Sequence, residues 1–143
     1  MVNLTGHNRD FVNKGLEIIR KGTHKGIAKI IDNSNINYTP TSSDLSYIVG
    51  PQLNAASRIE DSSLPSKLLI SEDLVEIESI SNKLMLLNEK RKLIENNVFE
   101  QVLDQVIKQT NQKFILVYGL GWHKGILGII ASKLVEKFNK PSI

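Results

Sequence analysis

The sequence contains no cysteine, and this absence removes several kinds of chemistry. Without a thiol, disulfide bonds, a nucleophilic cysteine and thiolate metal sites are excluded. No stretch approaches the roughly 18 apolar residues of a membrane-spanning helix. The segment 1–10 lacks the basic residues and apolar run of a secretion signal. We therefore expect a cytoplasmic chain that does not enter a membrane.

Clusters of acidic and histidine residues suited to a metal ion are also missing. Hydrolysis of a phosphodiester with divalent metals needs grouped carboxylates, often with histidine. The three histidines, His7, His24 and His123, are scattered, and no Asp-His-His or Asp-x-Asp grouping occurs. The acidic pair Glu72-Asp73 falls at an expected helix start, where capping explains it. The sequence thus predicts no catalytic residue and no metal bound by this chain.

The charge balance is modest. Eighteen Lys and Arg residues against fifteen Asp and Glu residues give a net charge of +3 and a pI near 9.1. This balance permits an anionic partner such as nucleic acid without requiring one. With 143 residues, 41% of them hydrophobic, the chain is long enough to bury a core.

The first half of the sequence predicts short helices. Apolar residues at helical spacing, followed by turn residues, indicate helices over residues 8–21 and 25–31. The polar run 39–44 predicts a loop into a third helix. Ser42 or Ser43 would cap that helix, which would run toward Gly50-Pro51.

Residues 71–110 contain neither Gly nor Pro and predict one long helix. Its apolar residues recur at alternating steps of three and four, with Arg91 filling one place: Ile77, Ile80, Leu84, Leu87, Ile94 and Val98. Such a helix would connect two bodies or self-associate as half of a coiled coil. Alternatively, it folds against its neighbours. The predicted domains are a helical part over 1–70, the connecting helix over 71–110, and a last part over 111–143.

The last part predicts an α/β unit. Residues 114–118 are β-branched and aromatic, as expected of a buried strand. A glycine-rich loop, a helix over about 126–138 and a second extended run at 140–143 follow. The overall prediction is a helix-rich α/β fold that ends inside a strand, loop and helix unit.

The glycine-rich loop is the first candidate binding site. Four glycines between positions 119 and 128 would let the backbone approach a ligand at the positive end of a helix dipole, where phosphate is the natural guest. A base could stack on the indole of the loop's tryptophan. The candidate residues are Gly121, Trp122, His123, Lys124, Gly125, Ser132 and Lys133. The alternative is that these glycines only make a tight corner.

The segment 50–58 is the second candidate. Asn54 and Arg58 are four residues apart and would share a face of a helix. Arg58 could pair with a phosphate, and Asn54 could hold a loop or a sugar. An Asn that caps a helix and an Arg in solvent explain the same spacing.

Both candidates resemble motifs of one family. Residues 121–134 resemble the Gly-Trp-His-x-Gly-Val-x-Gly-Ile-Val-Ala-Ser-Arg-Leu motif of the RecJ exonuclease family. Residues 50–58 resemble its Gly-Pro-Arg-Leu-Asn-Ala-Ala-Gly-Arg motif, and the segment from Leu4 to Leu16 resembles the stretch that follows its last catalytic motif. The resemblance covers essentially the whole chain, in the family's order.

The resemblance implies an internal fragment of a 5′ to 3′ exonuclease that acts on single-stranded DNA in repair and recombination. The full enzyme would use Mn²⁺ or Mg²⁺ held by an Asp-His-His domain that lies before this region. The part over 111–143 would begin the nucleic-acid-binding domain that accompanies it. Asn54, Arg58, His123, Ser132 and Lys133 would face the strand or its 5′ phosphate.

Three positions depart from the family's motifs. Gln52 and Lys133 stand where the family has Arg, and Ser57 stands where it has Gly. Lysine keeps the charge of arginine but loses its bidentate fork. Gln52 loses the charge, so a phosphate contact is expected to be missing there.

Other functions remain compatible with the residues. The chain could work as a subunit whose catalytic domain is a separate chain. It could be the remnant of a related small-nucleotide phosphoesterase. It could also be a non-catalytic helical interaction module that self-associates through the long helix.

Overall fold

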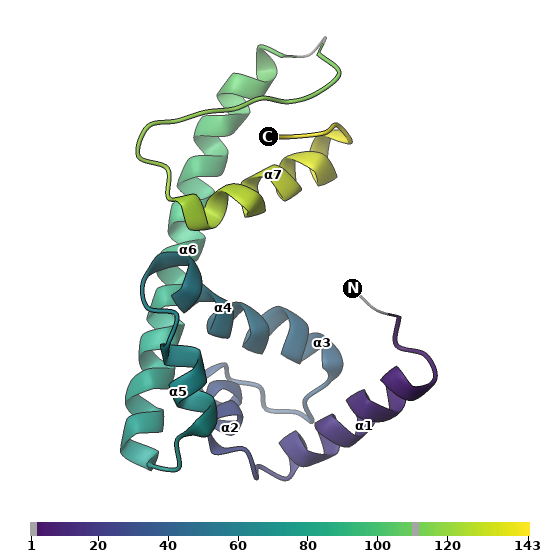
Figure 1. The fold of residues 1–143 in the computed structure, drawn as a ribbon, viewed down its shortest axis with the longest axis vertical. Helices are drawn as coiled ribbons and strands as arrows, with labels where there is room; N and C mark the ends of the chain where they lie inside the picture. The colour runs from purple at the N-terminus through teal and green to yellow at the C-terminus, as the bar shows by residue number, and fades with distance from the viewer. Residues whose placement is uncertain (1–2, 110–111) are drawn as a thin grey trace. The chain divides into compact units, whose positions relative to one another are not determined.

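The structure is a computed structural model that describes residues 3–109 and 112–143. The chain, drawn as a ribbon in Figure 1, divides into two compact units, Met1–Asn88 and Glu89–Ile143. Each unit has its own hydrophobic core. The long helix α6 (Leu74–Ile107) contributes its first half to one unit and its second half to the other. Within the described ranges, no helix is long and apolar enough to cross a membrane.

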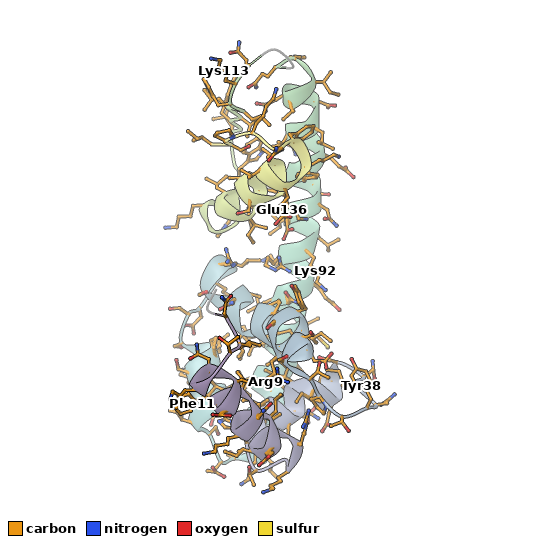
Figure 2. All side chains as sticks on the ribbon, turned by 90° about the vertical axis from the view of Figure 1, so that its right-hand side faces the viewer. Arg9, Phe11, Tyr38, Lys92, Lys113 and Glu136 are labelled. Carbon is orange, nitrogen blue, oxygen red and sulfur yellow. The ribbon has the colours of Figure 1, made fainter. Side chains whose placement is uncertain are left out.

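The first unit is built from short helices against the first half of α6. They are α1 (His7–Arg20), α2 (Lys25–Asn33), α3 (Ser42–Asp44), α4 (Gly50–Ile59) and α5 (Leu64–Ile70), with a π-helical turn at Leu45–Val49. The predictions for α1 and α2 are confirmed to within two residues. Helix α1 buries only Leu16, whereas its Phe11 is exposed (Figure 2).

The third helix differs from its prediction at both ends. Its cap is Thr41, whose hydroxyl accepts from the amide of Asp44, while the Asp44 carboxylate accepts from the amide and hydroxyl of Thr41. The hydrogen bonds from the side chain of Thr41, and then from Tyr38, lower the pKa of Asp44. The chain stays helical through Gly50-Pro51, and the proline lies in the first turn of α4, where its fixed φ suits a helix.

Helices α2 and α5 meet at a glycine. A Cβ on Gly26 would lie 2.3 Å from the backbone oxygen of Leu68 and 3.1 Å from its carbonyl carbon. Leu68 is fully buried beside Ile30 in the core of the first unit. The close backbone approach therefore requires glycine at this position.

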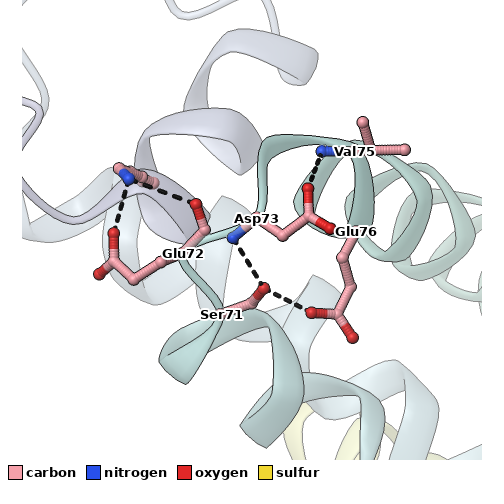
Figure 3. A network of polar contacts seen from close by, with 6 residues as sticks. Ser71, Glu72, Asp73, Val75 and Glu76 are labelled. Carbon is pink, nitrogen blue, oxygen red and sulfur yellow. Dashed lines mark hydrogen bonds and ion pairs between the residues drawn. The ribbon is translucent and has the colours of Figure 1, made fainter.

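Helix α6 begins at Leu74 behind a polar cap (Figure 3). The Asp73 carboxylate accepts from the amide of Val75 at 2.9 Å, and the Ser71 hydroxyl donates to Glu76 at 2.5 Å. Lys25 of α2 pairs with Glu72 at 2.6 Å. The expected capping role of the acidic pair is thus found in Asp73, and Glu72 ties the helix start to α2.

The apolar seam predicted for the long helix is buried within the chain. Ile77, Ile80, Leu84 and Leu87 lie in the core of the first unit, and Val98 lies in the core of the second. The hypothesis of a long helix folded against its neighbours accounts for this burial. Ile94 is partly buried beside the second core, and self-association through the long helix stays a prediction. Residue 110, the predicted helix end, and residue 111 lie outside the described residues.

The second unit joins the last half of α6 to an extended segment and α7 (Lys124–Phe138). Its core comprises Val98, Val102, Val106, Ile115, Ile126, Ile130 and Leu134. The buried positions 126, 130 and 134 recur every four residues and form the face of α7 that packs against the core. The amphipathic helix expected at 126–138 is confirmed and begins two residues earlier.

The prediction of an α/β fold is wrong, because the described residues form helices and no strand. Residues 114–118 are extended, but their backbone pairing is one isolated parallel bridge between Ile115 and Ser142. The Ile115 amide donates to the carbonyl of Pro141, and the Ile143 amide donates to the carbonyl of Ile115. The Val117 amide donates to the carbonyl of Ile143. On its other edge the segment meets the side chains of Gln105 of α6 and of Gln109, which lies in the turn after α6. The predicted burial is wrong as well, because Phe114, Leu116 and Tyr118 are exposed. A sheet also needs a ladder of backbone partners, which this segment lacks.

Candidate nucleic-acid interface

The candidate loop runs directly into the N-terminus of α7. His123 is the cap residue, and its Nδ1 accepts from the amide of Gly125 at 3.1 Å. The side chain that the sequence marked as a ligand contact therefore caps the helix. Lys124 is the first helical residue, and its side chain is exposed. A cation here stands beside the positive end of the helix dipole, an arrangement that attracts anions.

The local structure explains why glycine occupies two positions of the loop. A Cβ on Gly119 would lie 2.1 Å from Cε2 of Trp122, so the indole rests against the glycine backbone. Gly121 adopts a φ of 79°, which side-chain-bearing residues rarely take. The alternative that these glycines shape a corner explains both positions without a ligand.

Trp122 is held in place by the second unit. Its ring is partly buried against the core, and its Nε1 donates to Oε1 of Gln101 at 3.0 Å. Stacking of a base on the part of the ring that remains exposed stays a prediction.

The exposed side of α7 carries three of the motif residues. Lys124, Gly128 and Ser132 are four residues apart, so they lie in one row, and all three are exposed. The Ser132 hydroxyl donates to the carbonyl of Gly128 at 3.0 Å. A cation at the helix start, a bare glycine backbone and a hydroxyl therefore share one surface.

Lys133 belongs to a different face of α7. Its Nζ lies 2.5 Å from Oε1 of Glu95, whose Oε2 lies 2.5 Å from Nη1 of Arg91. The Glu95 side chain is only 7% exposed, and the Lys133 ammonium also lies over the ring of Phe99. This cluster was not predicted. The i to i+4 spacing of Arg91 and Glu95 and the charge in the apolar seam were the available signals.

Asn54 and Arg58 lie on α4 in the first unit. The segment is helical, as the hypothesis of a shared face required, with Asn54 exposed and Arg58 half-buried. Gln52 is buried on the same helix and donates to the hydroxyl of Ser34 at 2.8 Å. At this position, where the sequence departs from the family motif, the Gln52 side chain is part of the buried interior of the first unit. Asn54 and Arg58 thus belong to the first unit, whereas the glycine-rich loop belongs to the second.

The described parts of the chain do not fit a catalytic metal ion. In them, no three His, Asp or Glu side chains come close enough to hold one. His7 opens α1, His24 precedes α2, and His123 caps α7. No metal-dependent step can therefore be assigned to these residues.

Comparison with known proteins shows which family this chain is related to. No family model matches the chain. The single-stranded-DNA-specific exonuclease RecJ of Dickeya dadantii is 33% identical to it over 150 aligned residues, which cover the whole chain and 26% of that protein. The whole chain is homologous to a part of RecJ. The resemblance drawn from the motifs is confirmed.

Solved structures of RecJ agree with the fold. RecJ from Thermus thermophilus in complex with Mn²⁺ matches with a TM-score of 0.90 and 27% identity, over 99% of this chain and 21% of that one. The Mg²⁺ complex of the same protein matches with a TM-score of 0.88 and 26% identity, over 99% of this chain and 22% of that one. The metals belong to those proteins, and this chain spans between about a fifth and about a third of the RecJ chains it matches.

Proposed function

We propose that this chain is the part of a RecJ-type exonuclease that contributes to holding single-stranded DNA. The cutting step, with its Mn²⁺ or Mg²⁺, is assigned to residues outside these 143. The observation that carries the proposal is the exposed row Lys124, Gly128 and Ser132 at the start of α7. Homology to exonucleases named for single-stranded DNA supports it.

The roles of the row follow from its chemistry. The ammonium of Lys124 would pair with a phosphate near the helix N-terminus. Gly128 has no side chain to block a ligand from the helix backbone, and the space where a Cβ would lie is open, with nothing within 4 Å. Ser132 would offer its hydroxyl as a hydrogen-bond partner. On the first unit, Asn54 and Arg58 are proposed to face the same kind of ligand.

Fluorescence anisotropy with a labelled single strand tests the proposal. The purified chain is titrated with strands that do or do not carry a 5′ phosphate, at several salt concentrations. We expect binding that weakens with salt, is tighter for the phosphorylated strand, and releases no nucleotides in Mn²⁺. Lys124→Ala should weaken binding and reduce the slope of log affinity against log salt by about 0.7, the value for one lost phosphate contact.

Lys113→Ala is the matched control. Lys113 is an exposed lysine of the same unit (Figure 2), so the variant removes the same charge away from the start of α7. Equal losses for the two variants would mean that net charge alone holds the strand. A folded chain that binds neither strand, or one that releases nucleotides by itself, would contradict the proposal.

A further inference from the structure

Three glutamines, two on α6 and one in the turn that follows it, face the candidate loop and the segment before it. Gln101 and Gln105 are four residues apart on one face of α6, and Gln109 follows at the same spacing in the turn after the helix. We call this row the glutamine stripe. It alternates with the buried valines of the core, at positions 98, 102 and 106.

The side-chain amides of Gln105 and Gln109 make the hydrogen bonds that a neighbouring strand would make to the backbone of the extended segment. Gln109 donates to the carbonyl of Leu116 at 2.7 Å and accepts from its amide at 3.0 Å. Gln105 makes the same pair of bonds with Tyr118, at 2.7 and 3.2 Å. Four residues along a helix advance about 6 Å, and two extended residues advance about 6.6 Å. Gln105 and Gln109, the second just past the end of α6, can therefore meet alternate residues of the extended segment.

The third amide reaches the loop itself. Oε1 of Gln101 accepts from the indole N–H of Trp122 at 3.0 Å. The indole in turn rests on Gly119, whose backbone leaves no room for a Cβ. His123 follows immediately and caps α7. A continuous series of contacts therefore runs from the stripe to the helix terminus that carries Lys124.

We propose that the glutamine stripe is a positioning device for the strand-binding loop, an inference that rests on the proposed function. No glutamine of the stripe is assigned a contact with DNA. The stripe fixes residues 116–122 so that the start of α7 is already in its binding arrangement before a strand arrives. Loss of a stripe amide then weakens binding because the loop must be ordered at the moment of binding.

The single tryptophan of the chain makes this testable. In Gln101→Ala, the Trp122 emission should shift to longer wavelength and become easier to quench with iodide, while helical content by circular dichroism stays unchanged. The affinity for single-stranded DNA should fall by about two- to tenfold, the range of one neutral hydrogen bond. Asn97→Ala, which removes an exposed amide one turn before Gln101, should change neither signal.

Conservative variants separate positioning from a general loss of structure. Gln101→Glu keeps an acceptor for the indole N–H and should retain the wild-type emission. Gln105→Glu keeps the acceptor for the Tyr118 amide but loses the donor to its carbonyl, so it should disturb the segment as Gln105→Ala does.

The outcomes also separate this inference from the proposed function. A wild-type chain that binds no strand overturns the proposed function, and with it the consequence for binding. A chain that binds DNA equally well with and without Gln101 overturns the positioning role alone. Emission that changes as much in Gln101→Glu as in Gln101→Ala also overturns that role.

Discussion

The buried carboxylate of Glu95 should make the second unit sensitive to removal of its cations. Its side chain is 7% exposed and pairs with Arg91, which is 13% exposed, and with Lys133, which is 39% exposed. Lys133→Met removes one charge and keeps an unbranched side chain for the contact with Phe99. Arg91 still compensates Glu95, so we expect a loss of about 1–2 kcal/mol in the free energy of unfolding.

Removing both cations should cost much more. Arg91→Met combined with Lys133→Met leaves a buried carboxylate without a counter-charge, which costs about 3–5 kcal/mol. Adding Glu95→Leu removes the buried charge itself. The triple variant should return to within about 1 kcal/mol of the wild type, because apolar replacements of buried ion pairs are often neutral.

Urea denaturation followed by Trp122 fluorescence measures these changes, since the only tryptophan lies in the second unit. A triple variant as unstable as the double variant would refute the reasoning from buried charge. Anisotropy titrations of Lys133→Met add a second check. If Lys133 acts within the cluster, the salt slope of DNA binding should stay unchanged, whereas a phosphate contact would lower it by about 0.7.

Three further predictions concern single positions. Gly26→Ala should destabilise the first unit by about 1–3 kcal/mol in urea denaturation, because its Cβ would overlap a backbone oxygen, whereas Gly15→Ala, with open space around it, should stabilise by about 0.5–1 kcal/mol. The pKa of Asp44 is lowered in the fold, so its contribution is present above the ordinary carboxyl pKa of about 4 and is lost as pH falls below it; thermal melts should show wild type and Asp44→Asn converging in that range. Gly119→Ala should displace the indole of Trp122 and shift its emission, and an unchanged spectrum would contradict the packing described.

The residue sequence determined most of the helices and the relationship to RecJ. Apolar spacing and caps are local properties, so α1, α2, α6 and α7 could be predicted from neighbouring residues. The buried positions of α6 could be predicted because a helix must bury an apolar stripe, whichever elements cover it. The motif at 121–134 by itself indicates the homology to RecJ.

Only the tertiary structure decided how those elements are used. The segment 114–118 has the residues of a strand, yet it is held by Gln105 of α6 and Gln109 of the turn after it, partners that no periodicity connects to it. His123 caps a helix, and Lys133 turns to a buried carboxylate on α6. Residue type fixes what a side chain can bond to, whereas the partner it meets depends on packing between segments distant in the chain.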